Sequence, residues 1–446
     1  MDGIRKHYDL HVLMFPWLAH GHIYPFLELA KKLTQRNIFI YFCSTPALLS
    51  SIDKHIIPCS IRLVELHLPS LPNLPADRHT TKSLPLHLQP TLKTALDMSE
   101  PLFSDILSTF KPDLLIYDYI QPWAPQVAAA QNIPAIHFQT MGAAATSYLI
   151  HKFNPPTCET DFPFPNMYYY PEKELTKMSK FLASYSNNIS NNDRFVLGIK
   201  RSSSIILIKT FGEIEAEYIN YLSFLTGKEI LPLGLLIQDP VNALNGKDQI
   251  IEWLDSKGKA STVFVSFGSE YFMSWEELSE VNFVWVIRFP DGDEASSITK
   301  VDQVLPQGFL ERIGERGMIV EGWAPQMIIL EHPSIGGFVT HCGWSSVLEG
   351  MKLGVPLIAM PMHIDQPLNA RLIVELGVAV EVERDEDEKH GREEIANAIK
   401  QVMRNKQGHQ DIKRRVEEIS EHMARKGEEE MNLVVEKLMQ LCNKTK

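Results

Sequence analysis

Cysteine is scarce in this chain, with 5 copies among 446 residues. The copies are odd in number and scattered, and no two form a Cys-x-x-Cys pair: they are Cys43, Cys59, Cys158, Cys342 and Cys442. This pattern excludes a disulfide framework and a zinc site built on cysteine pairs. Reduced thiols in a cytosol are the simplest account, so we expect a cytoplasmic protein.

Long apolar runs and an excess of positive charge are also lacking. The N-terminus, MDGIRKHYDLHVLMFPW, has no long apolar run before its first strand-like segment. We therefore expect neither a signal peptide nor stable insertion in a membrane. The formal net charge is −12, from 43 basic and 55 acidic residues. This balance argues against a polyanionic partner such as nucleic acid.

The remaining composition is that of an ordinary globular protein, 44% hydrophobic and 22% charged. A chain of 446 residues exceeds one comfortable core, so we expect two domains. Apolar strand candidates alternate with segments of helical period, which is the pattern of parallel α/β architecture. We predict two doubly wound parallel-sheet domains.

Strand candidates recur along both halves of the chain. In the first half they are Leu10–Leu18, Ile38–Cys43, Ile61–Leu68, Leu114–Tyr119, Ala135–Gln139 and Ser204–Ile208. In the second half they are Thr262–Ser266, Asn282–Arg288, Met318–Val320, Ile335–Val339, Pro356–Met360 and Val378–Val382. Between the first two candidates, Ile23, Phe26, Leu27, Ala30 and Leu33 have the spacing of an amphipathic helix.

A segment rich in helix breakers, Leu231 to Gly246, marks the boundary between the halves. We accordingly expect a first domain over residues 1–235, a linker over 236–250, a second domain over 251–426 and a terminal helix over 427–446. The chain ends in two charged helical stretches, Asp411–Lys426 and Glu428–Asn443. Solvated faces with an apolar stripe explain them better than a partner-binding role.

The stretch from Trp323 to Gln366 is the most informative part of the chain. It contains a strand-like run, the turn HCGWSS over residues 341–346, and a helix-forming segment with Glu349. Strand, glycine-containing turn and helix start together make a phosphate site, because a helix N-terminus offers free N–H groups and partial positive charge. Glu349, one turn into the helix, suits the two hydroxyls of a ribose.

This stretch resembles the signature box of the plant family-1 UDP-sugar-dependent glycosyltransferases, with Trp, His, Glu and Asp-Gln in register. The resemblance implies the GT-B fold, in which two Rossmann-like domains face a cleft, and a last helix that crosses back onto the first domain. It also implies the donor contacts. By this resemblance, uracil is held by Trp323, the Ala324 backbone and Gln326, and ribose is held by Glu349. The diphosphate is held by His341, Gly343 and Ser346, and the sugar by Trp344, Asp365 and Gln366.

Two features depart from the family pattern. Ser345 stands where the family usually has Asn, which puts one polar contact to the phosphate or sugar in doubt. The crossover from Glu270 to Val281 is shorter than in relatives. A parallel crossover with its helix needs roughly 10–12 residues, so this one lies at the geometric minimum. The shortening leaves the motif residues in place and bears on the stability and activity of the second domain.

Two histidines, His20 and His22, follow the opening strand, where α/β folds place their chemistry. A histidine suits the removal of a proton from an alcohol near neutral pH. The family motif His-x-x-Pro fits His22 with Pro25, whereas His20 does not fit it. We therefore assign His22 as the catalytic base and leave His20 at the acceptor entrance.

A base of this kind needs a partner that fixes its tautomer. Asp118 closes an apolar strand of the same sheet, and a carboxylate there is costly to bury unless it is paired. By resemblance, it pairs with the catalytic His22. Two further strand ends bear on the donor: Thr140 can supply a hydroxyl toward the donor sugar, and the family places Ser269 against the diphosphate or sugar.

The predicted reaction is inverting transfer of glucose from UDP-glucose to a hydroxyl. UDP would leave into the helix N-terminus at Ser345 and Ser346, so its charge meets preorganised donors. That makes a metal unnecessary, and the chain has no clustered ligand set for one. We expect no cofactor besides the UDP-sugar co-substrate, and a monomer.

The opening strand-loop motif and the segments near Trp253, Ser266 and Phe283 resemble enzymes that extend sugars on natural products, including triterpenoid glycosides of the mogroside type. The expected acceptor is thus a glycoside, in a pocket of mixed polarity. Its candidate lining residues are Trp17, Tyr119, Trp123 and Phe138, for which core packing is about equally favoured, and His20 at its entrance. A flavonoid glycoside, a UDP-sugar epimerase and a silenced UDP-sugar-binding protein remain rival hypotheses, and the linkage, 1→6 or 1→2, stays open.

Overall fold

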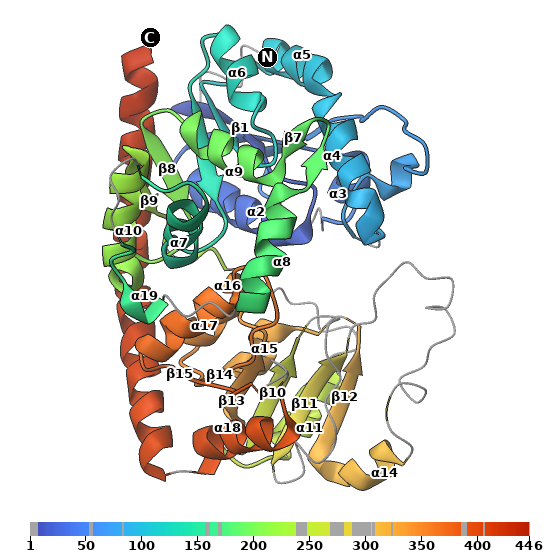
Figure 1. Ribbon diagram of the computed structural model, residues 1–446, viewed down its shortest axis with the longest axis vertical. Coiled ribbons are helices and arrows are strands. Elements are labelled where there is room, and N and C mark those ends of the chain that lie inside the picture. Colours follow the sequence, from blue (N-terminus) through green and yellow to red (C-terminus); the bar gives the residue numbers. More distant parts are fainter. Residues whose placement is uncertain are drawn as a thin grey trace. The chain divides into compact units, whose positions relative to one another are not determined.

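The computed structural model describes residues 8–52, 57–82, 84–156, 161–167, 172–237, 248–267, 281–287, 305, 308–322, 324–384, 390–404 and 406–445. The chain divides into two compact units, each with its own parallel sheet (Figure 1). The first consists of Met1–Pro163, Pro171–Gln238 and Lys426–Lys446, and the second of Phe164–Tyr170 and Asp239–Arg425. The predicted α/β class is confirmed.

The sheet of the first unit has the strand order β3-β2-β1-β4-β5-β8-β9, and all neighbouring strands are parallel. Its strands are β1 (Leu10–Phe15), β2 (Ile38–Ser44), β3 (Ile61–Glu65), β4 (Leu114–Tyr117), β5 (Ala135–Gln139), β8 (Ile205–Ile208) and β9 (Glu229–Pro232). Successive strands are added in opposite directions from β1, so the strand order reverses between β1 and β4. In a doubly wound sheet this switch point is where ligands bind.

The helices of the first unit follow its strands along the chain. They are α2 (His20–Thr34), α3 (Pro46–Leu49), α4 (Gln89–Asp97), α5 (Glu100–Phe110), α6 (Ala124–Ala130), α7 (Ala143–Phe153), α8 (Glu172–Ala183), α9 (Asn191–Lys200) and α10 (Gly212–Thr226). A short antiparallel hairpin, β6 (Tyr185–Ser186) with β7 (Ile189–Ser190), lies between α8 and α9.

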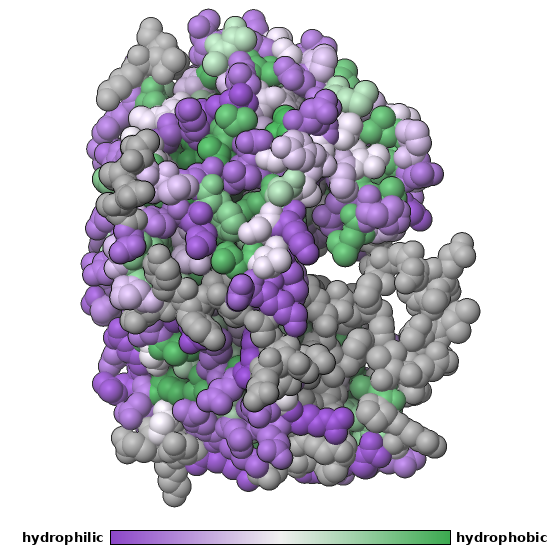
Figure 2. All heavy atoms as spheres, in the orientation of Figure 1, coloured by the Kyte–Doolittle hydropathy of each residue, from purple (hydrophilic) through white to green (hydrophobic). Residues whose placement is uncertain are grey.

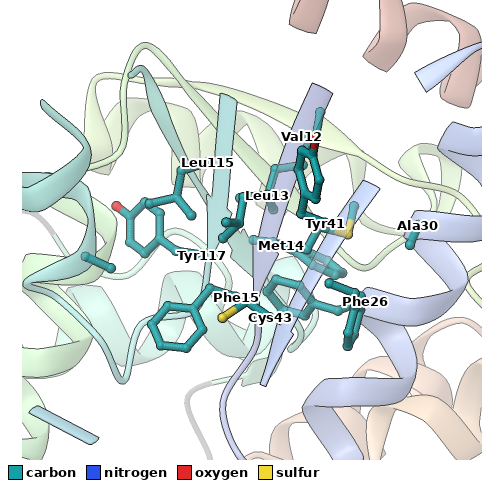
Figure 3. Close-up of a cluster of buried hydrophobic side chains, with 14 of the residues drawn as sticks. Val12, Leu13, Met14, Phe15, Phe26, Ala30, Tyr41, Cys43, Leu115 and Tyr117 are labelled. Carbon is teal, nitrogen blue, oxygen red and sulfur yellow. The ribbon is translucent and has the colours of Figure 1, made fainter. Parts of the chain in front are cut away.

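The core of the first unit surrounds its central strands. Every residue of β1, β2 and β4 is buried, as expected for parallel strands that are covered on both faces. Figure 3 shows side chains of β1, β2 and β4 packed with Phe26 and Ala30 of α2. The predicted amphipathic helix is therefore confirmed, and its apolar stripe fixes α2 against the strand that precedes it.

The sheet of the second unit has the order β12-β11-β10-β13-β14-β15 and is also parallel throughout. Its strands are β10 (Thr262–Ser266), β11 (Asn282–Ile287), β12 (Gly317–Glu321), β13 (Ile335–Thr340), β14 (Leu357–Ala359) and β15 (Ala379–Glu381). The helices are α11 (Asp248–Asp255), α14 (Phe309–Ile313), α15 (Gln326–Glu331), α16 (Trp344–Lys352), α17 (Gln366–Glu375) and α18 (Arg392–Arg404). Here the switch point lies between β10 and β13.

The chain ends in one long helix, α19 (Lys406–Thr445), instead of the two predicted charged stretches (Figure 1). The prediction of a break at Gly427 was wrong. A helical glycine costs only about 1 kcal/mol relative to alanine, and buried apolar side chains recur at helical spacing on both sides of it. Those residues are Val416, Ile419 and Met423 before it, and Met431, Val434, Leu438 and Cys442 after it. The latter four belong to the core of the first unit.

The breaker-rich segment also begins later than predicted. Leu231 and Pro232 end β9, which is the last strand of its sheet. Proline is tolerated there because an edge strand does not need every N–H group for pairing. At its other end, the expected linker over 236–250 overlaps α11, which starts at Asp248. Residues 238–247 lie outside the described ranges.

The coloured residues on the face shown in Figure 2 are mostly hydrophilic, with small groups of hydrophobic residues between them. Among the described residues, no helix is both long and apolar enough to cross a membrane.

Candidate active site

His22 and Asp118 both lie at the switch point of the first sheet. β1 ends at Phe15, a short loop follows, and α2 begins at His20 with Ala19 as its N-cap. Asp118 comes directly after β4, and Phe15 and Tyr117 are register partners across the β1–β4 pair. Because the carboxyl ends of parallel neighbours meet at one edge, the sheet delivers both side chains to the same place.

The two side chains are in direct contact. His22 Nδ1 lies 2.7 Å from Asp118 Oδ2, and the side chain of His22 is 20% exposed whereas that of Asp118 is 1% exposed. An ionised carboxylate only accepts hydrogen bonds, so His22 Nδ1 must carry a proton. In the neutral imidazole the lone pair is then on Nε2. The pair therefore has the geometry of an oriented base.

Backbone groups hold the Asp118 carboxylate in this position. The Tyr119 N–H donates to Oδ1 at 2.8 Å, and the Trp17 N–H donates to Oδ2 at 3.2 Å. The Asp118 N–H donates in turn to the Phe15 carbonyl at 3.3 Å. These contacts compensate a buried carboxylate for lost hydration. Trp17 and Tyr119 thus contribute through their main chains.

His20 occupies a different environment from His22. Its Nε2 lies 3.4 Å from Ser51 Oγ, and its ring contacts that of Tyr24. Burial, and then the positive charge of Lys82, lower the pKa of His20 below its usual value. Among the ion pairs of the described residues, none joins His20 to a carboxylate. His20 therefore lacks the orienting partner that His22 has.

Thr140 lies closer to the histidine than the sequence indicated. Its Oγ1 is 3.4 Å from His22 Nδ1, at the end of β5. The candidate was proposed for its reach toward the donor sugar, and the structure makes it a neighbour of the base. His137 of β5 is fully buried, and its Nε2 lies 3.3 Å from Gln139 Oε1. Burial lowers its pKa to about 4, so it is neutral at physiological pH.

The expected acceptor-lining residues fall into two groups. Tyr119 is half-buried, and its ring centroid lies 6.1 Å from that of His22. Trp123 and Phe138, in contrast, pack in the core. The Trp123 Nε1–H donates to Asp97 Oδ1 at 2.9 Å, and Phe138 is fully buried against Phe26. Trp17 is likewise buried in the core, so Tyr119 and His20 are the two candidates that remain partly exposed.

In the second unit, the turn from β13 into α16 has a tight backbone conformation. Cys342 adopts a positive φ of 64°, and Gly343 is the N-cap of α16. A Cβ on Gly343 would lie 2.7 Å from His341 Nε2, so a larger residue there would require the His341 side chain to shift. The N–H groups of a helix of 9 residues begin here. The arrangement suits an anionic ligand.

Polar side chains around this turn are joined by Gln326. Its Nε2 donates to Ser346 Oγ at 3.1 Å and to Glu349 Oε2 at 2.6 Å. The residues assigned by sequence to uracil, diphosphate and ribose are thus brought together, with Ala324 buried just before α15. Trp323 and Ser269, as well as most of the short crossover from Glu270 to Val281, lie outside the described residues.

The acid–amide pair at the start of α17 is also fixed. Gln366 Oε1 accepts hydrogen bonds from the N–H groups of Met362 and His363 at 2.9 and 3.0 Å. These two bonds fix the orientation of the side-chain amide. Burial is the main effect on Asp365 and raises its pKa, while the hydrogen bond from Asn369 opposes the rise.

Asn369 was missed by the sequence analysis. Its Nδ2 donates to Asp365 Oδ2 at 2.9 Å and to the Cys342 carbonyl at 3.0 Å, so it ties the sugar-side residues to the β13–α16 turn. Trp344, at the first helical position of that turn, is buried, and Ser345 is half-buried. The spacing of Asp365 and Asn369 on one helical face was the available signal.

Two family profiles match this chain. The profile described as glycosyltransferase, N-terminal domain, matches residues 9–229, and that of UDP-glucoronosyl and UDP-glucosyl transferase matches residues 247–421. A mogroside IIIx synthase from Siraitia grosvenorii is 47% identical, over 98% of this chain and 98% of its own. The chain belongs to the UDP-sugar-dependent glycosyltransferases. The resemblance stated from the 323–366 stretch is confirmed, and so is a UDP-glycosyltransferase activity.

Other members of this glycosyltransferase family are similar over nearly their whole length. A β-D-glucosyl crocetin β-1,6-glucosyltransferase from Gardenia jasminoides is 46% identical, over 97% of this chain and 99% of the relative. A flavanone 7-O-glucoside 2''-O-β-L-rhamnosyltransferase from Citrus maxima is 44% identical, over 99% of each.

The fold of the glycosyltransferase also matches solved structures. A Glycyrrhiza uralensis enzyme, crystallised with glycyrrhetinic acid 3-O-monoglucuronide, superposes with a TM-score of 0.79. The match covers 97% of this chain and 96% of the other at 23% sequence identity, a likeness that concerns the fold alone. The GT-B prediction is confirmed.

Proposed function

We propose that this glycosyltransferase transfers glucose from UDP-glucose to a hydroxyl of a natural-product glycoside, with inversion at the anomeric carbon and without a metal ion. The acceptor we favour is a sugar hydroxyl of a triterpenoid glycoside of the mogroside type. The observation that carries the proposal is the 2.7 Å contact between His22 Nδ1 and the buried Asp118 carboxylate. A protein that only binds a UDP-sugar has no need of such a pair.

In the proposed reaction, Nε2 of His22 accepts the proton of the acceptor hydroxyl. The acceptor oxygen attacks the anomeric carbon from the face opposite the diphosphate, and the bond from that carbon to UDP breaks. Asp118 stabilises the imidazolium that forms and keeps the ring in its productive orientation. We assign Thr140, whose Oγ1 lies 3.4 Å from His22 Nδ1, to a contact with the donor sugar.

The second unit would hold the donor. We assign uracil to Trp323, Ala324 and Gln326, ribose to Glu349, the diphosphate to Ser269, His341, Gly343, Ser345 and Ser346, and the sugar to Trp344, Asp365 and Gln366. The charge that develops on the departing UDP meets the N-terminus of α16, whose N–H groups and dipole need no reorganisation. This electrostatic support is what makes a metal ion unnecessary in the proposal.

The choice of a glycoside acceptor is supported by the relatives. The Siraitia relative is a mogroside IIIx synthase, and the Gardenia relative is a glucosyltransferase of β-D-glucosyl crocetin. A second candidate, a flavonoid glycoside, is favoured by the Citrus relative, whose name specifies a flavanone 7-O-glucoside. The same names contain both a 1,6 and a 2'' position, so the linkage stays open.

An acceptor screen with UDP-glucose, read by mass spectrometry, tests the proposal. We expect a triterpenoid monoglucoside to gain one hexose far faster than its aglycone, and added EDTA to leave the rate unchanged. Polar groups arranged for an acceptor sugar would be left unpaired by an aglycone, which costs orders of magnitude in discrimination. Comparable turnover of both would contradict the glycoside proposal. UDP binding in calorimetry without turnover of any acceptor would favour a silenced binding protein.

A further inference from the structure

Gly198 of α9 contacts both chain neighbours of Asp118. The hydroxyl of Tyr117, the residue before Asp118, donates to the Gly198 carbonyl at 2.6 Å, and this contact is buried. On the other side, a Cβ built on Gly198 would lie 2.7 Å from the Cα and 2.9 Å from the Cβ of Tyr119. Helix and strand end therefore approach so closely that a side chain larger than hydrogen must displace the Tyr119 backbone.

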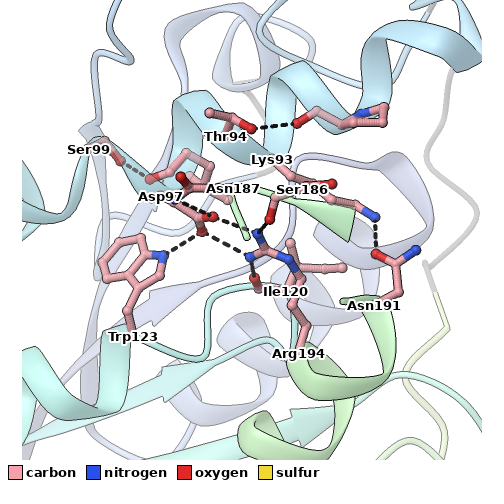
Figure 4. A network of polar contacts seen from close by, with 12 residues as sticks. Lys93, Thr94, Asp97, Ser99, Ile120, Trp123, Ser186, Asn187, Asn191 and Arg194 are labelled. Carbon is pink, nitrogen blue, oxygen red and sulfur yellow. Dashed lines mark hydrogen bonds and ion pairs between the residues drawn. The ribbon is translucent and has the colours of Figure 1, made fainter. Parts of the chain in front are cut away.

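The rest of α9 holds the same segment in place. The Arg194 guanidinium, fully buried, forms an ion pair with Asp97 and donates to the Ile120 carbonyl at 2.9 Å (Figure 4). The Arg201 guanidinium donates to the Pro122 carbonyl at 2.6 Å. With Gly198, these contacts hold Tyr119, Ile120 and Pro122 of the segment after β4 against α9 and its C-cap residue Arg201.

A displacement of Tyr119 would be transmitted to the Asp118 carboxylate, because Oδ1 accepts the Tyr119 N–H at 2.8 Å. The other carboxylate oxygen is the one that meets His22. We propose that Gly198 is a positioning residue for the His22–Asp118 pair, acting through Tyr117 and Tyr119. The inference rests on the proposed function, since it assumes that Asp118 orients the base.

The test compares G198A with G427A. Both replace a helical glycine by alanine, but a Cβ on Gly427 meets nothing within 4 Å. We expect G198A to lower kcat by about 10–100-fold, since a misplacement of about 1 Å can cost 10²-fold, with UDP affinity and the KM for UDP-glucose unchanged. G427A should keep the wild-type kcat. A G198A enzyme as fast as G427A would overturn the proposal.

The double variant G198A/D118N distinguishes positioning from a general packing defect. If Gly198 acts through the carboxylate, the double variant is no slower than D118N alone, because coupled residues are not additive. Multiplied losses in the double variant would overturn the proposal. If D118N itself keeps the wild-type kcat, the proposed role of Asp118 fails, and the role of Gly198 fails with it. If D118N is slow and G198A is as fast as the wild type, only the proposed role of Gly198 is contradicted.

Y117F keeps the test valid if G198A does not fold. It retains the ring and removes only the hydroxyl that donates to the Gly198 carbonyl. We expect a smaller loss of kcat than in G198A, again with unchanged UDP affinity, and no further loss when it is combined with D118N. A folded Y117F with the wild-type kcat, or one whose loss multiplies with that of D118N, would overturn the proposal.

Discussion

At the scale of the residue, the candidate base is fixed by contacts that reach beyond its own side chain. Asp118 has two oxygens and receives three donors, namely the N–H groups of Trp17 and Tyr119 and Nδ1 of His22. A carboxylate saturated in this way has little freedom to turn. The His22 ring is consequently held with one nitrogen engaged, and the orientation exists before any acceptor binds.

We predict that H22A abolishes most transfer while UDP affinity stays nearly unchanged. Removal of a general base typically costs about 10²–10⁴-fold in rate. D118N should cost less, because the imidazole remains and loses only its orienting partner. Steady-state rates with UDP-glucose and a glycoside acceptor, alongside calorimetry with UDP, provide the measurement.

H20A is the matched control for H22A, since both histidines lie in the first turn of α2. His20 contacts Ser51 and no carboxylate among the described ion pairs, so its loss should be much milder. Equal impairment of the two single variants would show that the roles are assigned wrongly.

In the donor site, E349A and Q366A should fail in different ways. Glu349 accepts a hydrogen bond from Gln326 and is the residue proposed for the ribose, whereas Gln366 is proposed for the sugar. We expect E349A to weaken UDP and UDP-glucose alike, by about 10–100-fold if one charge-assisted hydrogen bond of roughly 1.5–3 kcal/mol is lost. Q366A should spare UDP and weaken UDP-glucose. Equal loss of UDP binding in both variants would contradict this division.

The sequence predicted site residues where a strand end or a motif marks the position, as for His22, Asp118 and the turn at Gly343. It did not predict Asn369 or Gly198. Their contacts with Cys342 and Tyr119, far along the chain, leave no local pattern, and the spacing of Asn369 from Asp365 was the one local signal. Trp123 and Phe138 illustrate the opposite case, because an aromatic residue near a strand end looks the same in sequence whether it lines a pocket or packs in the core.

At the scale of the element, the strands were predicted well because buried parallel strands are continuous apolar runs. The elements that were missed carry contradictory signals. β9 contains Pro232 at a sheet edge, and the β6–β7 hairpin is a very short pair turned by Asn187 and Asn188, both with positive φ. α19 was divided at a glycine that tertiary packing overrides.

α19 carries a pH-dependent contact with the start of α10. Glu430 Oε1 accepts the Gly212 N–H at 2.7 Å. Burial, against the opposing hydrogen bond from Gly212, raises the pKa of Glu430 from 4.5 to about 7, and nearby Glu213 raises it whereas Lys426 lowers it. The folded state therefore favours the protonated acid. The stabilisation is present below pH 4.5 and is lost as pH rises through about 7.

We predict that the melting temperature of E430Q, relative to that of the wild type, is higher at pH 8 than at pH 5. The amide keeps an oxygen for the Gly212 N–H and never bears the buried charge. Melting temperatures of the two proteins at both pH values provide the measurement. The same difference at pH 5 and pH 8 would mean that Glu430 does not titrate in this window.

At the scale of the whole molecule, the two parallel sheets share one feature, which is the position of the candidate residues at the switch point. Each unit places its candidate residues after the strands that flank its switch point, His22 and Asp118 in the first and the β13–α16 turn in the second. Strand alternation and length were enough to predict this organisation. The acceptor was not predictable at the same level, since it depends on side chains that many sequences can arrange.

The most direct test of the central claim is the anomeric configuration of the sugar added to a triterpenoid glucoside, measured by NMR on the isolated product. UDP-glucose carries its sugar in the α configuration. Attack from the face opposite the diphosphate, by a hydroxyl that His22 has deprotonated, predicts a β-linked glucose. An α-linked product, or UDP-glucose that binds while no glycoside is ever extended, would contradict the account.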